Sequence, residues 1–397
     1  MTLRRICSME EWKEYILGDV SQIKGGKRLP KGVNLITSPN CHPYIRVRDL
    51  GTKKTIELNT SFEYVDEETQ KSISKYTVEK GDIIISIVGT IGLVAIIGDS
   101  LNNANLTENC VKIVNSNTLN REYLYYYLIS KFGQDEIKNG TVGAVQAKLP
   151  IKNIQDIKVK APSLSEQTKI ASVLKSLDDK IEVNRRINDN LELQAQALFK
   201  SWFVDFEPFK DGDFVDSELG MIPKGWSVVS LDNLIVVKYG KDHKKLGEGE
   251  IPVYGSGGWM RNVNKSLYKG ESVLIPRKGS LNNVMYVNEE FWTVDTMFYT
   301  LPIVQDVLLY VYIYLCNKDL ASFNAGSAVP SMTTEILNNM RIIMPSHEVL
   351  HVFNKKVYTM YEDIKHRDDE SHCLAQLRDT LLPRLMSGEI KVGDVTL

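Results

Sequence analysis

Basic residues gather in one stretch near the start of the chain. Between residues 21 and 54 a single acid, Asp49, stands among eight cations, which are Lys24, Lys27, Arg28, Lys31, Arg46, Arg48, Lys53 and Lys54. Such a density of positive charge favours contact with phosphate groups, and Gly25, Gly26 and Gly32 would let a phosphate backbone approach closely. The alternative is a solvated charged face, which is what most charge runs are.

A second basic group recurs later in the chain. It begins with Lys238, Lys241, His243, Lys244 and Lys245, and it continues through the Gly-rich stretch around Ser256 to Arg277, Lys278 and Ser280. On a duplex, Lys and Arg position the protein on phosphates, while Arg, Asn, Gln and Ser can specify base edges. We therefore predict a nucleic-acid surface in each half of the chain.

Polar residues in Gly-rich loops are the further candidates for contacts. Thr90 follows Gly89 in an expected tight turn between two β-branched runs. The other loop candidates are Gln146, Lys148, Ser327 and Ser331. A plain turn role is an equal alternative for these four.

No set of residues suggests catalysis. The chain has no phosphate-binding GxxxxGK[ST] loop, no GxSxG and no GxGxxG opening a helix. His347 and His351 are four residues apart and could hold a metal in principle, but a solvated or interface role is favoured, because no set of carboxylates or thiolates is near them in sequence. We expect a binding or scaffold component with no metal.

Composition sets broad limits. The formal net charge of 397 residues is -2, so DNA binding must rest on local patches. Five scattered Cys residues without a CxxC pair favour a reducing compartment. The longest apolar run, residues 83–97, is too short to span a membrane. We expect a cytoplasmic protein.

Two long helices must position these surfaces. From about Ser165 to Phe203 apolar residues alternate every four and three positions, as in a coiled-coil seam. The seam comprises Ile170, Leu174, Leu177, Ile181, Asn184, Asn188 and Leu191. Adding 183 to this series reaches a second seam, between about Ser346 and Leu382, that includes Phe353, Val357, Met360, Ile364 and Leu374. We expect the two helices to pair antiparallel.

Polar residues interrupt both seams at the same depth. Asn184 and Asn188 are expected to face Arg367 and Ser371 and to fix the register of the pair. Alternatively, they mark a place where the helices of another protein dock.

The globular parts repeat as well. Residues 225–234 (GWSVVSLDNL) echo residues 11–20 (EWKEYILGDV) at an offset of 214, and the helices repeat at 183. The chain is therefore expected to be a duplicated unit, a mixed α/β domain plus a long helix, twice. A polar stretch, residues 207–226, would link the copies.

Several phrases resemble the specificity (S) subunit of type I restriction-modification systems. They are Pro162 to Gln167 (PSLSEQ), Ala195 to Phe209 (AQALFKSWFVDFEPF), Asp216 to Trp226 (DSELGMIPKGW) and Leu377 to Ile390 (LRDTLLPRLMSGEI). Together with the repeat, the resemblance covers nearly the whole chain.

The resemblance implies an α+β fold with two target-recognition domains separated by two antiparallel coiled-coil helices, an internal pseudo-two-fold repeat. The expected parts are a first recognition domain (residues 1–161), a first spacer helix (162–207), a linker with the second recognition domain (208–344) and a second spacer helix with a tail (345–397). Each domain would read one half of a bipartite, gapped target on double-stranded DNA. The helices would set the gap and dock two modification subunits.

The resemblance also implies which chemistry lies elsewhere. This chain would catalyse nothing and hold no cofactor. S-adenosylmethionine would bind to the modification subunits, which methylate adenine, and ATP and Mg to restriction subunits. Two rivals stay open: a self-sufficient methyltransferase, and a coiled-coil adaptor whose domains bind protein.

Overall fold

A computed structural model describes residues 12–51, 53–115, 118–323 and 331–395. The chain divides into two compact units, each containing one globular domain and stretches of both long helices. Unit 1 comprises residues 1–183 and 370–397, and unit 2 comprises residues 184–369. The long helices are α6 (Leu164–Phe203) and α9 (His347–Ser387), and each passes from one unit into the other without a break. The expected parts instead kept each helix whole, in a segment of its own.

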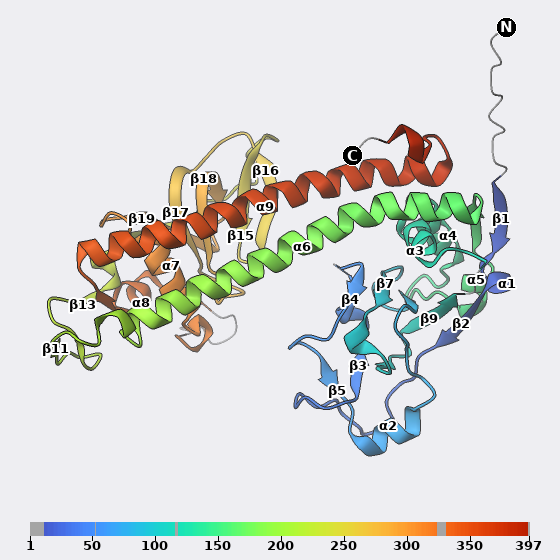
Figure 1. The fold of residues 1–397 in the computed structure, drawn as a ribbon, viewed down its shortest axis with the longest axis horizontal. Coiled ribbons are helices and arrows are strands. Elements are labelled where there is room, and N and C mark those ends of the chain that lie inside the picture. The colour runs from blue at the N-terminus through green and yellow to red at the C-terminus, as the bar shows by residue number, and fades with distance from the viewer. Residues whose placement is uncertain (1–11, 52, 116–117, 324–330, 396–397) are drawn as a thin grey trace, which may run out of the picture. The chain divides into compact units, whose positions relative to one another are not determined.

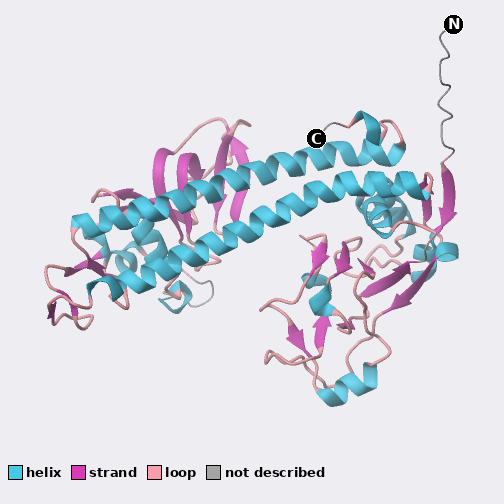
Figure 2. Cartoon of the chain, viewed as in Figure 1, coloured by secondary structure: helices cyan, strands magenta, loops and turns pink. Residues whose placement is uncertain are grey.

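The globular domain of unit 1 mixes short strands and helices (Figures 1 and 2). A five-stranded sheet has the order β2-β9-β6-β7-β4, and a three-stranded sheet has the order β5-β3-β8. The strands are β2 (Ser21–Gly25), β3 (Pro43–Ile45), β4 (Thr55–Ile56), β5 (Glu63–Tyr64), β6 (Ile83–Ser86), β7 (Val94–Ile97), β8 (Asn105–Leu106) and β9 (Cys110–Asn115). The helices are α1 (Leu17–Val20), α2 (Glu67–Ile73), α3 (Arg121–Ile129), α4 (Lys131–Gly140) and α5 (Ile151–Gln155).

The domain of unit 2 is built around a six-stranded sheet of order β14-β19-β17-β18-β15-β16. Its strands are β14 (Ile235–Tyr239), β15 (Ile251–Gly255), β16 (Gly258–Val263), β17 (Tyr268–Pro276), β18 (Met285–Thr293) and β19 (Met297–Pro302). Its helices are α7 (Leu308–Cys316) and α8 (Thr334–Asn338). The expected linker contains a small hairpin of β11 (Phe214–Val215) and β12 (Ile222–Pro223).

Each domain is closed by one antiparallel strand pair at its junction with a long helix. In unit 1, β1 (Lys13–Ile16) pairs with β10 (Lys158–Ala161), and in unit 2, β13 (Ser227–Ser230) pairs with β20 (Arg341–Met344). Lys13 opposes Ala161, and Ser227 opposes Met344, so the two registers match at the offsets of 214 and 183. The repeat predicted from sequence is present in the backbone hydrogen bonding.

One segment differs from the sequence interpretation. The β-branched residues of 151–162 (IKNIQDIKVKAP) predict a strand before the first long helix. Instead, Pro150 is followed by the helix α5, and only Lys158–Ala161 is a strand. The fixed φ of proline suits the position before a helix, and five residues are too few to show a helical period.

The helix pair is antiparallel in both units (Figure 1). In unit 1, Leu174 and Leu177 of α6 share a core with Leu381, Leu382 and Leu385 of α9. In unit 2, Phe199 and Phe203 pack against Phe353, with ring centroids 6.2 and 4.8 Å apart. The stripe between the helices is therefore apolar, as a coiled-coil seam requires.

The two asparagines of the seam, Asn184 and Asn188, lie in unit 2 with Arg367, whereas Ser371 lies in unit 1. Asn184 donates to the Arg367 carbonyl at 3.5 Å, as the expected pairing would place it. Asn188 instead donates to the Ile364 carbonyl at 3.3 Å and to the Asp368 carboxylate at 2.8 Å. In an antiparallel pair, moving forward along one helix moves backward along the other, which is why Asn188 contacts residues before Ser371.

The other seam candidates differ in burial. Ile170, Leu174, Leu177, Phe353, Val357 and Ile364 are buried. Ile181, Leu191, Met360 and Leu374 are partly exposed.

Candidate nucleic-acid interface

The same backbone corner follows the first sheet strand of each domain. In unit 1, the N–H of Gly26 donates to the Cys110 carbonyl (3.1 Å) and the N–H of Lys27 to the Leu106 carbonyl (2.8 Å). In unit 2, Gly240 donates to the Met297 carbonyl (3.0 Å) and Lys241 to the Thr293 carbonyl (2.8 Å). We call these the Gly-Lys corners, Gly26-Lys27 and Gly240-Lys241.

Only glycine fits at the first position of each corner. A Cβ on Gly26 would collide with the carbonyl oxygens of Leu106 and Thr107, and a Cβ on Gly240 with the Val294 carbonyl oxygen. The lysines that follow, Lys27 and Lys241, are both exposed. The fold thus holds one lysine of each domain in an equivalent, solvent-facing place.

A turn after the central strand is also matched. The N–H of Ile87, just after β6, donates to the Asn109 carbonyl (2.8 Å), and the N–H of Arg277, just after β17, donates to the Thr296 carbonyl (2.8 Å). The carbonyl of Ile87 accepts from Leu149 and that of Arg277 from Met332, each at 2.9 Å. Ile87 and Arg277 are therefore the same backbone position in the two domains.

These hydrogen bonds bring the predicted loop residues together. Val88 forms a β-bridge with Lys148, and Lys278 forms one with Ser331. Thr90 and Gln146 are exposed in the two loops joined by the first bridge. Ser327 lies outside the described residues. Each domain therefore has one surface at which its Gly-rich turn and its later loop meet.

The arginines of the first basic stretch are engaged by carboxylates. Arg28 pairs with Glu108 (Nε to Oε1, 2.6 Å), and Arg48 pairs with Glu63 (Nη2 to Oε2, 2.9 Å). Arg46 pairs with Glu63 and Asp49, and its side chain is only 18% exposed. The pKa of Arg46 is lowered, mainly because burial disfavours the charged guanidinium, and the nearby charge of Asp49 opposes this shift. Arg46 therefore holds this loop in place, and its charge is partly neutralised within the domain.

The basic loop of the second domain is anchored from two sides. Trp292 Nε1 donates to the Lys241 carbonyl (2.8 Å), and Arg261 Nη2 donates to the carbonyls of His243 (2.6 Å) and Leu246 (3.1 Å). Lys244 and Lys245 are exposed on this loop. A fixed loop presents these cations at a lower entropic cost on binding.

Ser256 lies beside the Arg277 turn. Asn283 Nδ2 donates to the Ser256 carbonyl at 2.9 Å, and a Cβ on Gly279 would meet Ser256 Oγ at 2.8 Å. Arg277 in turn lies over the ring of Tyr239, next to the Gly-Lys corner, with 5.4 Å from its guanidinium carbon to the ring centroid. The structure thus gathers Lys241, Ser256, Arg277, Lys278, Ser280 and Ser331 on neighbouring segments of one domain.

Paired tyrosines fix each domain to the strand that leads into its long helix. Tyr123 and Tyr127 of α3 donate to the carbonyls of Lys160 (2.8 Å) and Lys158 (2.9 Å). In unit 2, Tyr310 of α7 donates to the Ile343 carbonyl and Tyr314 to the Arg341 carbonyl (2.8 Å). The same contacts therefore join α3 or α7 to the strand before the long helix in both copies.

Unit 1 adds a partly buried charged network at this joint. Arg378 of α9 pairs with Asp178 of α6 (Nη1 to Oδ1, 2.7 Å), and Tyr126 of α3 donates to the same carboxylate (2.5 Å). Burial disfavours the charged guanidinium, but hydrogen bonds to Asp178 and Asp379 outweigh this and raise the pKa of Arg378. Three elements meet at this one carboxylate.

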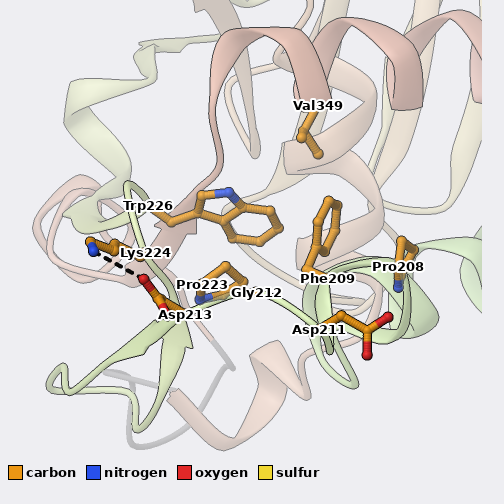
Figure 3. Close-up of a pocket in the computed structure, with 9 residues that line it drawn as sticks. All are labelled: Pro208, Phe209, Asp211, Gly212, Asp213, Pro223, Lys224, Trp226 and Val349. Carbon is orange, nitrogen blue, oxygen red and sulfur yellow. Dashed lines mark hydrogen bonds and ion pairs between the residues drawn. The ribbon is translucent and has the colours of Figure 1, made fainter.

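A pocket of about 410 Å³ lies in unit 2, where the chain leaves α6 (Figure 3). The rings of Phe209 and Trp226 line it with Val349, and Lys224 pairs with Asp213 across its edge (3.0 Å). The pocket includes none of the predicted DNA-binding residues. Its one lysine is already paired, so it does not resemble a phosphate or cofactor site.

The stretch from His347 to His351 (HEVLH) matches the H-E-x-x-H pattern of zinc proteases, which the sequence interpretation did not recognise. In the structure, His351 Nδ1 lies 2.7 Å from Asp306 Oδ2, and His347 is exposed at the start of α9. Within residues 12–51, 53–115, 118–323 and 331–395, no three His, Cys, Asp or Glu side chains gather as a metal site. The pattern here has no third ligand among the residues described.

Comparison with protein families matches the chain to the type I restriction modification DNA specificity domain over residues 9–193 and 223–362. The two matched stretches cover well over half of the chain and follow its repeat. This chain belongs to that family. It is accordingly a specificity subunit of the type I restriction-modification class and not a catalytic one.

Curated relatives align with this chain over nearly their full length. The type I restriction enzyme MjaIX specificity subunit of Methanocaldococcus jannaschii is 26% identical, over 97% of this chain and 95% of the relative. The type I restriction enzyme HindI specificity subunit of Haemophilus influenzae is 24% identical, over 96% of this chain and 100% of the relative.

A crystal structure of a type I restriction-modification S subunit from M. genitalium has the same fold. Its TM-score is 0.56 at 18% identity, and the match covers 96% of this chain and 98% of that chain. In the present chain, no helix among the described residues is long and apolar enough to cross a membrane.

Proposed function

We propose that each domain of this specificity subunit reads one half of a bipartite DNA target. The observation that supports this most directly is the matched pair of surfaces: the Gly-Lys corners and the turns at Ile87 and Arg277 have the same backbone hydrogen bonds but different side chains around them. We call this shared backbone, the Gly-Lys corner with the turn after the central strand, the frame of each domain. One frame that carries two different sets of side chains suits two different half-sites. The predicted DNA-binding residues stay proposals within these surfaces.

The lysines of the frame carry the phosphate part of the proposal. Lys24 and Lys238 occupy equivalent exposed places on β2 and β14, three residues before Lys27 and Lys241. With the residues that the structure describes, these four lysines form no ion pair within 4.0 Å. Unpaired cations release counterions when they meet phosphates, and this release drives binding.

We propose further that α6 and α9 set the gap between half-sites and dock two modification subunits. The helices are 40 and 41 residues long, so each extends about 60 Å at 1.5 Å per residue. The cofactor chemistry would then belong to the partners, with S-adenosylmethionine in the modification subunits and ATP with Mg in restriction subunits. Calorimetry of S-adenosylmethionine with the isolated chain should show no binding, and tight binding would favour a self-sufficient methyltransferase.

Methylation-aware sequencing of the host genome tests the main proposal. We expect a gapped, two-part motif with methylated adenine in each part, and we expect its loss when the gene for this chain is deleted. A motif that survives the deletion, or a host with no gapped motif, would contradict the proposal. If the chain binds no duplex, alone or with its modification partner, the protein-binding adaptor becomes the better account.

A further inference from the structure

The turns after β6 and β17 differ in side-chain chemistry at their matched residues, Ile87 and Arg277. Ile87 and Arg277 make the same two backbone hydrogen bonds in their domains. Each N–H donates to a carbonyl of the loop before β9 or β19, and each carbonyl accepts from an N–H of the later loop, that of Leu149 or Met332. One domain therefore presents an aliphatic side chain and the other a guanidinium from one backbone site.

The guanidinium of Arg277 is positioned by contacts within the domain that use few of its hydrogen-bond donors. It lies over the Tyr239 ring, 5.4 Å from the centroid, and Nη1 donates to the Asp295 carbonyl at 3.2 Å. Within the part of the chain that the structure describes, this is the one hydrogen bond of the side chain, and Arg277 remains partly exposed. Since a guanidinium has five N–H donors, most of them stay available to a ligand.

Residues that are equivalent in both domains and residues that differ between them suit different kinds of contact with DNA. Phosphates are common to every half-site, so equivalent cations such as Lys27 and Lys241 suit contact with them. Base edges differ between half-sites, so the residues that read them must differ as well. Arginine donating two parallel hydrogen bonds to guanine O6 and N7 is the commonest specific contact in the major groove.

We infer that Arg277 is a specificity-determining residue of the second domain that reads a guanine edge, while Lys241, 36 positions before it, binds phosphate. The inference rests on the proposed function, because it assigns roles within that same surface. The aliphatic Ile87 would leave the first domain without this contact.

The experiment uses the full chain purified from its host with the subunits that copurify, and a pool of randomised DNA duplexes as the probe. Selection with the unmodified protein should enrich two half-sites. Arg277→Lys keeps the charge but loses the planar fork. We expect it to lose the preference for guanine at one position of one half-site by about 5- to 150-fold, with the other half-site unchanged.

Lys241→Ala is the matched comparison. It should weaken binding to all selected duplexes and reduce the salt slope of binding by about 1, while the enriched motif stays the same. Thermal melts of both variants should match that of the unmodified protein, because both side chains are on exposed loops.

The outcomes separate the two levels of inference. If Arg277→Lys retains the full motif, or weakens all duplexes uniformly as Lys241→Ala does, the role of Arg277 is overturned and the proposed function stands. If the unmodified protein enriches no sequence from the pool, the proposed function falls and this inference falls with it.

Discussion

Lys27 and Arg46 lie in the same basic stretch, but their surroundings differ. Lys27 is exposed beside the Tyr76 ring, 5.5 Å from Nζ to the centroid. Arg46 is held by Asp49 and Glu63, and the Asp49 side chain is only 3% exposed. Charge density in a sequence predicts that some cations face a ligand, but it does not indicate which ones are needed by the fold.

Substituting these two residues should therefore have opposite signatures. Arg46→Ala removes the partner of a buried carboxylate, and we expect a loss of about 1 to 3 kcal/mol in the free energy of unfolding, measured by urea denaturation. Lys27→Ala should leave stability unchanged and reduce the salt slope of DNA binding by about 1. If Arg46→Ala left stability unchanged and lowered only the salt slope, Arg46 would be a phosphate contact.

The glycine of each corner offers a second prediction at this scale. Gly26→Ala and Gly240→Ala place a Cβ against fixed carbonyl oxygens, so the corner must move and the following lysine with it. We expect weaker DNA binding in both variants and increased hydrogen exchange at the N–H groups of Lys27 and Lys241. Gly32→Ala is a poor control because Gly32 has a positive φ of 84°, but Gly257, with open space around its Cβ, is suitable.

At the scale of elements, the Asp178 network joins α3, α6 and α9 in unit 1. Neither of its long-range pairings could be predicted, because Asp178 and Arg378 are 200 residues apart and an offset of 183 relates Arg378 to Ala195 instead. The repeat predicts where elements recur, but not where one copy has gained a charged contact.

Arg378→Ala should destabilise unit 1. It leaves the Asp178 side chain, 11% exposed, without its cationic partner, and we expect a cost of about 1.5 to 3 kcal/mol by thermal or urea denaturation. Asp379 also pairs with Arg378 but is 64% exposed, so Asp379→Ala should cost little. Equal effects of the two variants would mean that the buried pair adds no stability.

A carboxyl group in the other half of the helix pair gives a pH dependence. Burial, with the charges of Asp189 and Asp368, raises the pKa of Glu192. The folded chain thus holds this proton more tightly than the unfolded chain does, so stability falls as pH rises from the unfolded pKa through the folded one. Glu192→Gln should raise the melting temperature at neutral pH and flatten its dependence on pH above 4.5. An unchanged profile would contradict this.

At the scale of the whole molecule, the seam alternation of α6 and α9 allows a test of spacing. Seven residues are two helical turns and preserve the alternation. We expect matched seven-residue insertions, after Val183 in α6 and after Asp369 in α9, to lengthen the gap of the methylated motif by about three base pairs, from roughly 10 Å of added helix. An insertion in α6 alone should impair assembly. An unaltered gap with both insertions would refute the spacing proposal.

The sequence predicted this overall plan well, because it is repeated. Trp12 and Trp226, together with the strand registers they precede, recur at the offset of 214 in both sequence and structure. Local partners were less predictable. Glu63 meets Arg46 only because a short strand pair brings residues 43–45 beside 63–64, and Ile151–Gln155 is too short to show its helical period.

The backbone construction of the two frames bears on how this protein can change. The bonds that position residues 27, 87, 241 and 277 run between main-chain atoms, so substituting the exposed side chains leaves them intact. If Arg277 reads a base edge as proposed, a substitution at residue 277 would alter which duplexes are bound and leave these backbone bonds in place. A population carrying this gene could acquire a new target by single substitutions, without first passing through an unstable ancestor.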